Sequence, residues 1–237
     1  MIKFGLYLYI YKNIKIMVKN SKRISKYNTD GALKHFSQFE SPYDIQLFLN
    51  GIKYNPCLDT ASPKKVLLNR QANCFEGALF ASAALRGLGY KPLIVDFMTQ
   101  NDDDHVIAIF KRGNLFGAVA KSNTTLLRYR EPVYRTLREL VMSYFDFYFN
   151  IYGEKSLRSY SNPVDLSRFD KYNWMMTDED LGFIGDYLYE VKHHDLVDKK
   201  IIRTLHYADK DVVDVCFSGA IDEGLFKPKK RKLKDSN

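Results

Sequence analysis

One cysteine and one histidine of this chain stand at positions that suit nucleophilic catalysis. Cys74 is the second residue of the segment NCFEGALFASAALRGLGYKP (73–92) and begins the helix predicted there, and His105 opens a predicted strand. At a helix start, the free main-chain N–H groups and the positive end of the helix dipole favour a thiolate over a thiol. An imidazole beside such a thiol takes its proton, and the thiolate then attacks a carbonyl carbon.

Acyl chemistry also needs groups that support this pair. His105 would return the proton to the leaving group, and the N–H of Cys74 would help to hold the oxyanion. A third residue would fix the tautomer of the imidazole. The alternative interpretations are a buried structural cysteine at position 74 and a solvated histidine that follows the acidic residues 102–104.

The helix that would position Cys74 has well-marked ends. Asn73 can cap it, Glu76 three positions later can complete a capping box, and Gly89 and Pro92 end it. Small and apolar residues fall on one stripe at helical spacing, so the helix can pack closely against a sheet. The residues of this stripe are Cys74, Ala78, Ala81, Leu85 and Leu88.

Three predicted strands follow this helix, at residues 91–98, 105–110 and 115–121. The last two form a hairpin with a tight turn at Arg112–Gly113, where Gly113 supplies a positive φ. The order of helix, strands and further helices predicts an α+β fold with a C-terminal helical extension from about residue 130. The other predicted helices lie at 41–51, 131–150, 177–194 and 209–224.

The pattern C-x-x-x-A-x-x-A-x-x-A-L-R-x-L-G-x-x-P from Cys74 to Pro92, followed by a strand and by D-H-V at 104–106, resembles the transglutaminase-like superfamily. The resemblance covers about residues 66–123, roughly a quarter of the chain. It implies a papain-like core, in which the nucleophile helix packs on an antiparallel sheet, with additional C-terminal helices. It also implies that Cys74 is the nucleophile, that His105 is the base, and that an acidic or amide residue lies on the adjacent strand.

The third position departs from the pattern of the superfamily. In a hairpin that turns at Arg112–Gly113, His105 faces Ala120, which cannot orient an imidazole. A bulge in the turn would shift the register by one residue and bring Asn123 onto the face of His105. Because an amide oxygen accepts the imidazole N–H well, Asn123 is the preferred third residue. The other candidates are Ser122, Lys121, Asp104 and Asp96.

Together these features predict cysteine-dependent acyl transfer, or hydrolysis of an amide or peptide bond, by Cys74, His105 and Asn123. The substrate would be a peptide, a protein or a small amide. The alternative is a catalytically inactive binding or scaffold module, because the position opposite the histidine lacks a carboxylate. No cofactor or metal is expected: His193 and His194 point in different directions, and the sequence lacks a phosphate loop and a nucleotide fingerprint.

Charge and composition limit the domain organisation and the partners. The 237-residue chain has a net charge of +8, of which residues 1–27 carry +7 and residues 226–237 carry +5, leaving −4 for residues 28–225. We therefore expect one folded domain at 28–225, a basic segment outside the fold at 1–27, and a disordered basic tail at 226–237. Binding of nucleic acid is expected only through that tail.

The cysteines and the hydropathy predict a soluble, cytoplasmic protein. Three cysteines at scattered positions form no disulfide framework, which is typical of a reducing compartment. The apolar run at 4–11 is too short to span a bilayer, so no contact with a membrane is expected. The three cysteines of the chain are Cys57, Cys74 and Cys216.

Overall fold

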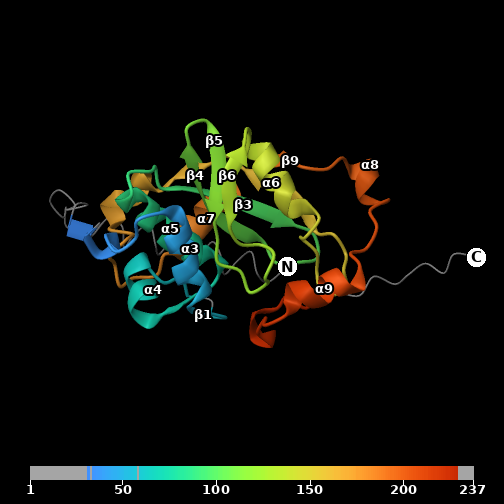
Figure 1. Ribbon diagram of the computed structural model, residues 1–237, viewed down its shortest axis with the longest axis horizontal. Coiled ribbons are helices and arrows are strands. Elements are labelled where there is room, and N and C mark those ends of the chain that lie inside the picture. The colour runs from blue at the N-terminus through green and yellow to red at the C-terminus, as the bar shows by residue number, and fades with distance from the viewer. Residues whose placement is uncertain (1–30, 33, 58, 229–237) are drawn as a thin grey trace, which may run out of the picture.

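The described part of the chain is a mixed α+β fold built on one antiparallel sheet (Figure 1). The computed structural model describes residues 31–228 apart from 33 and 58, so the predicted N-terminal segment and most of the predicted tail lie outside the described residues. The sheet has the strand order β6-β5-β4-β3-β7-β9, and β8 also pairs with β3. The predicted α+β class is confirmed. In this part of the chain, no helix combines the length and the apolar character that crossing a membrane requires.

The elements have the following bounds. The strands of the sheet are β3 (Leu93–Thr99), β4 (His105–Arg112), β5 (Leu115–Val119), β6 (Arg130–Tyr134), β7 (Leu157–Ser161), β8 (Val164–Asp165) and β9 (His193–Asp195). A separate parallel pair consists of β1 (Lys53–Tyr54) and β2 (Gln71–Ala72). The α-helices are α3 (Pro42–Asn50), α4 (Pro63–Asn69), α5 (Cys74–Gly87), α6 (Leu137–Phe145), α7 (Gly182–Glu190), α8 (Lys199–Ile202) and α9 (Lys210–Phe217). Short 3-10 helices are η1 (Lys34–Phe36), η2 (Leu166–Tyr172) and η3 (Asp222–Gly224).

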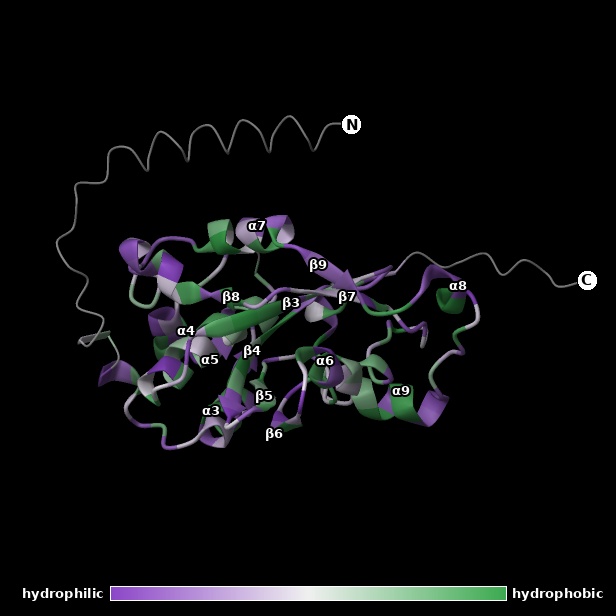
Figure 2. Cartoon of the chain, turned by 90° about the horizontal axis from the view of Figure 1, so that it is seen from above, coloured by the Kyte–Doolittle hydropathy of each residue, from purple (hydrophilic) through white to green (hydrophobic). Residues whose placement is uncertain are grey.

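The two faces of the sheet bury different helices, because side chains alternate along each strand. One face presents Ile94, Val106 and Ala108 to the cluster that contains the buried residues of α5, α3 and α7. The opposite face presents Val95 and Ile107 to the cluster that contains the buried residues of α6. Figure 2 shows the hydrophobic character of β3, which lies at the centre between these clusters.

The start of α5 is organised by a buried carboxylate. The predicted capping box is confirmed: the side chain of Asn73 accepts from the N–H of Glu76 at 2.9 Å, and Glu76 accepts from the N–H of Asn73 at 2.8 Å. The fully buried Glu76 also accepts from the amide of Asn55, at 3.0 and 3.1 Å, and from the N–H of Ala61, at 2.8 Å. One carboxylate thus joins the helix start to the loop that follows β1.

The short β1–β2 pair completes this arrangement. Tyr54 pairs with Ala72, and the N–H of Asn55 donates to the carbonyl of Ala72 at 3.1 Å. Ala72 lies two residues before Cys74. The pairing therefore brings Tyr54 alongside the first turn of α5.

The first turn of α5 approaches the chain just after β5 closely enough to require a glycine. A Cβ atom on Gly77 would lie 2.3 Å from the Cβ of Lys121. Lys121 is itself buried, and its Nζ donates to the carbonyls of Leu49 at 2.9 Å and Ile52 at 2.7 Å, at the end of α3. Small residues in α5 therefore let α3, α5 and the sheet meet at one point.

The β4–β5 hairpin has a different register from the one predicted. Gly113 has the expected positive φ of 61°, but Arg112 pairs with Leu115, so the two turn residues are 113 and 114. The register is shifted by two residues, and the last pair of the ladder is Ala108 with Val119. Ala120 is therefore not opposite His105. Its main chain instead forms two hydrogen bonds with the side chain of Gln46, at 3.0 and 2.8 Å.

The chain after residue 130 adds strands to the sheet, which corrects the predicted helical extension. Residues 130–134 form β6 at the edge of the sheet, where Pro132 needs no donor, and α6 starts only after the cap Thr136. Strands β7, β8 and β9 pair on the β3 side. The predicted helix at 177–194 is shorter, because Asp180 accepts from the N–H of Thr60 at 2.6 Å and α7 begins at Gly182.

Two glycines within helices provide a test of the close contact at Gly77. Gly77→Ala should lower the free energy of unfolding by about 1–3 kcal/mol, since the strain of overpacking exceeds the gain in helix propensity. Gly185→Ala in α7 is the matched control, because its Cβ would lie 3.4 Å from Phe75, an ordinary contact. It should be neutral or stabilising by up to about 1 kcal/mol. Urea denaturation measures both, and equal effects would contradict the packing described.

Candidate active site

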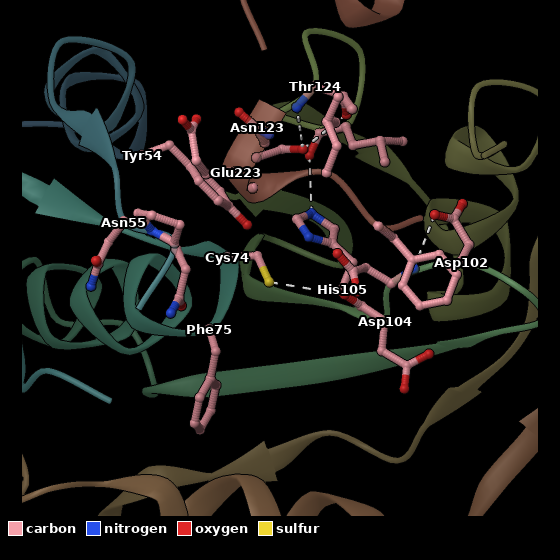
Figure 3. A pocket seen from close by; sticks show the side chains of 18 of the residues that line it. Tyr54, Asn55, Cys74, Phe75, Asp102, Asp104, His105, Asn123, Thr124 and Glu223 are labelled. Carbon is pink, nitrogen blue, oxygen red and sulfur yellow. Dashed lines mark hydrogen bonds between the residues drawn. The ribbon is translucent and has the colours of Figure 1, made fainter. Parts of the chain in front are cut away.

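A cavity of about 690 Å³ contains both predicted catalytic residues (Figure 3). Cys74 reaches it from the start of α5, and His105 from the start of β4. Figure 3 shows both side chains near the middle of the cavity wall. Other residues that line it are Tyr54, Asp102, Asp103, Asp104, Ser122, Asn123, Leu127, Tyr148 and the C-terminal residues 223–227.

The sulfur of Cys74 lies against the main chain on both sides of His105. It is 3.9 Å from the carbonyl oxygen of Asp104 and interacts with the N–H of Val106. These groups lie at the start of β4, beyond the point where β5 ends at Val119. Because β5 ends early, the start of α5 can contact β4 there. The side chain of Cys74 remains partly exposed.

His105 is held in one orientation by a main-chain carbonyl. The residue is buried, its Nε2 lies 3.1 Å from the carbonyl oxygen of Leu127, and its ring packs edge-on against Phe97 and Tyr148. A carbonyl oxygen only accepts hydrogen bonds, so Nε2 carries the proton of the neutral ring. Nδ1 then keeps its lone pair, which is the form that a general base needs.

The carbonyl of Leu127 takes the position predicted for Asn123. The side chain of Asn123 also lines the cavity, but its amide donates to the carbonyl of Ile221 at 2.9 Å and accepts from the N–H of Ile221 at 3.0 Å. The physical reason is the hairpin register, since β5 ends before it reaches the level of His105. The other candidates also bond elsewhere: Ser122 to Thr124, Lys121 to Leu49 and Ile52, Asp104 to Thr99, and Asp96 to His193.

Burial keeps the pair uncharged at neutral pH. Burial raises the pKa of the Cys74 thiol to about 12, although the N–H groups of Val106 and Phe75 oppose the rise. Burial also lowers the pKa of His105 to about 4, and the hydrogen bond to Leu127 opposes that change. The expected thiolate at the helix start is therefore not the resting state, because desolvation outweighs the effect of the helix dipole.

Tyr54 is a cavity residue that the sequence did not indicate. Figure 3 shows its side chain directed into the cavity beside Cys74. Burial raises the pKa of Tyr54 far above its usual value, although the N–H of Cys74 interacts with its oxygen and opposes the rise. The phenol therefore stays protonated and can donate a hydrogen bond next to the sulfur.

The opposite wall of the cavity is acidic. Burial raises the pKa of Asp102 to about 6, although the hydroxyl of Ser156 donates to it at 2.6 Å and opposes the rise. The pKa values of Asp103 and Asp104 are also raised, first of all by burial, and repulsion from Asp104 adds to the rise for Asp103. This wall would favour a positively charged group on a ligand.

The two adjacent histidines considered in the sequence have separate partners. The Nε2 atom of His193 lies 3.1 Å from a carboxylate oxygen of Asp96, and Nε2 of His194 lies 2.8 Å from the side-chain oxygen of Asn162. Both histidines belong to β9, and not to the end of a helix as predicted. Among residues 31–228 apart from 33 and 58, no three His, Cys, Asp or Glu side chains are grouped to hold a metal ion.

The buried imidazole predicts a loss of stability in acid. Below its usual pKa of 6.5 the unfolded chain protonates His105, whereas the folded chain does so only near pH 4. Stability is therefore lost as the pH falls from 6.5 to 4. Between pH 7 and pH 5 the wild-type protein should lose about 2 kcal/mol more than His105→Gln, measured by urea denaturation at both values. An equal loss in the two proteins would mean that His105 is not a buried neutral base.

Comparison with known proteins gave no match, either to the models of protein families or to curated proteins. The chemistry of the cavity is therefore inferred from its residues, their contacts and their surroundings.

Proposed function

We propose that the protein is a cysteine-dependent enzyme that transfers acyl groups or hydrolyses amide or peptide bonds, with Cys74 as nucleophile and His105 as general base. One observation carries the proposal: the Cys74 sulfur contacts the main chain on both sides of His105, inside a cavity large enough for a substrate. The anchored Nε2 of His105 adds support, because it leaves Nδ1 free of a proton.

The proposed reaction begins with a neutral pair. As the sulfur attacks the substrate carbonyl, the thiol proton moves to Nδ1 of His105, and an S–C bond and an oxyanion form together. The tetrahedral intermediate then collapses, the C–N bond breaks, and His105 gives the proton to the leaving amine. Water or a second amine attacks the resulting thioester and releases the thiol of Cys74. The attacking water or amine gives up a proton, which passes through His105 to the sulfur and replaces the one that left with the first amine.

Tyr54 is the group proposed to stabilise the oxyanion. Its phenol is protonated, lines the cavity and lies at the N–H of Cys74. The oxyanion of the substrate carbonyl, formed when the Cys74 sulfur attacks, would accept a hydrogen bond from this phenol and from the main-chain N–H groups at the start of α5.

The wider assignment follows the resemblance of residues 66–123 to the transglutaminase-like superfamily. The position of Cys74 at a helix start packed on an antiparallel sheet supports it. The carbonyl of Leu127 would replace the side chain that orients the histidine. A peptide, protein or small amide is the proposed substrate, and a reducing compartment such as the cytoplasm is the proposed location, because all three cysteines are free thiols.

A second candidate function is that of a binding module without catalysis. The observation that favours it is the resting state, in which burial raises the pKa of Cys74 to about 12 and lowers that of His105 to about 4. Transfer of the thiol proton to His105 then requires a bound substrate that brings the pKa values of Cys74 and His105 closer together.

Acylation by 4-nitrophenyl acetate distinguishes the two functions. The wild-type chain should release one equivalent of nitrophenolate in a burst, because the Cys74 sulfur forms a stable thioester. Cys74→Ala should abolish the burst, and His105→Ala should slow it roughly 100-fold. Cys57→Ser, which removes an exposed thiol that lines the same cavity, should leave it unchanged. A burst of the same size in Cys74→Ala would contradict the proposal that Cys74 is the nucleophile. The absence of a burst in the wild-type chain would favour the binding module.

The role of Tyr54 has its own test. Tyr54→Phe removes the phenolic donor and keeps the ring, so the acylation rate should fall roughly 100-fold. Alkylation of Cys74 by iodoacetamide, which forms no oxyanion, should change by less than about threefold. Equal losses in the two reactions would assign Tyr54 a structural role instead.

A further inference from the structure

The cavity is lined on one side by the chain's own C-terminal segment, which we define as residues 221–227. Residues 223–227 of this segment lie in the same cavity as Cys74 and His105. The proposed reaction uses no atom of the segment. The residues that contact this segment therefore indicate which kind of ligand this part of the cavity can bind.

Asn123 binds the segment only through main-chain atoms. Its amide donates to the carbonyl of Ile221 at 2.9 Å, and its side-chain oxygen accepts from the N–H of Ile221 at 3.0 Å. Ile221 has an extended backbone, with φ of −93° and ψ of 136°. Any residue with this backbone presents the same donor and acceptor, so the contact recognises a peptide without reading its side chain.

Gly224 lies where a side chain cannot fit. A Cβ atom there would be 2.7 and 2.8 Å from the ring of Tyr54 and 2.9 Å from the amide nitrogen of Asn123. The oxygen on the Tyr54 ring interacts with the N–H of Cys74, and the amide of Asn123 is held by its two bonds to Ile221, so movement of either side chain would break these contacts. This part of the wall therefore accepts glycine and rejects larger residues.

Charge favours a basic residue three positions further on. Lys227 of the segment lines the cavity together with Asp102, Asp103 and Asp104. A lysine or arginine at this position of a peptide would be attracted to these carboxylates across the cavity.

We propose that Tyr54 and Asn123 form a subsite for the main chain of a substrate peptide, and that the C-terminal segment occupies this subsite in the free protein. The proposal rests on the proposed function and names its substrate class. The substrate is a peptide with glycine against the ring of Tyr54 and a basic residue three positions after that glycine.

Binding of a fluorescein-labelled peptide, AIDEGLFKP, tests the subsite without requiring catalysis. It repeats residues 220–228. The full chain with Gly224→Val, whose own segment no longer fits, should bind this peptide at least tenfold more tightly than the wild-type chain in a fluorescence anisotropy titration. Gly224→Ala provides a second release variant with a smaller side chain. Val215→Ala, at an exposed position of α9, is the control and should bind as the wild-type chain does.

Two further measurements locate the binding. The peptide AIDEVLFKP should bind the Gly224→Val chain at least tenfold more weakly than AIDEGLFKP. Adding Asn123→Ala to that chain should weaken binding of AIDEGLFKP at least tenfold, because two hydrogen bonds are lost. Equal binding of the two peptides, or no gain from either release variant, would overturn the subsite. If the peptide binds as expected and the nitrophenolate burst is absent, the subsite stands and the proposed catalysis fails.

Discussion

The buried carboxylate of Glu76 is the interaction on which the candidate site depends. It accepts hydrogen bonds from Asn73, Asn55 and Ala61, which belong to the helix start and to the loop after β1. Removal of the carboxylate would take the partner from each of these buried or part-buried donors, and such a loss is costly. The same contacts hold Tyr54 beside Cys74. Fold stability and the assembly of the site therefore depend on the same side chain, which also takes part in the cap at the start of α5.

The segment that follows β5 has a second organising role. The carbonyl of Leu127 orients His105, while Asn123 and Thr125, in the same short stretch, bind the main chain of Ile221 and Cys216. Orientation by a main-chain carbonyl needs no particular side chain, but it requires that the path of the chain be fixed. Burial of Leu127 and the packing of Phe97 and Tyr148 around the ring fix that path. The imidazole and the C-terminal segment are thus held by neighbouring parts of one loop.

The sequence predicted those features that depend on local chemistry. The capping box of Asn73 and Glu76 and the positive φ of Gly113 are encoded within a few residues, and both are present. The strand register, the early end of β5 and the strands after residue 130 depend on contacts between distant segments, and these were missed. A main-chain carbonyl such as that of Leu127 has no signal in a sequence, and neither has Tyr54, whose two-residue strand is too short to form a pattern.

The contact between the C-terminal segment and the proposed subsite is intramolecular, and this affects the apparent affinity for other peptides. A tethered ligand acts at an effective concentration that is roughly millimolar for a short flexible connection. A free peptide of equal affinity displaces the tethered segment only when its concentration exceeds this effective concentration. A peptide of lower affinity needs a proportionally higher concentration. The measured affinity of the intact chain for any outside peptide would therefore be weaker than the intrinsic affinity of the proposed subsite, and weakly binding peptides would be excluded by competition alone.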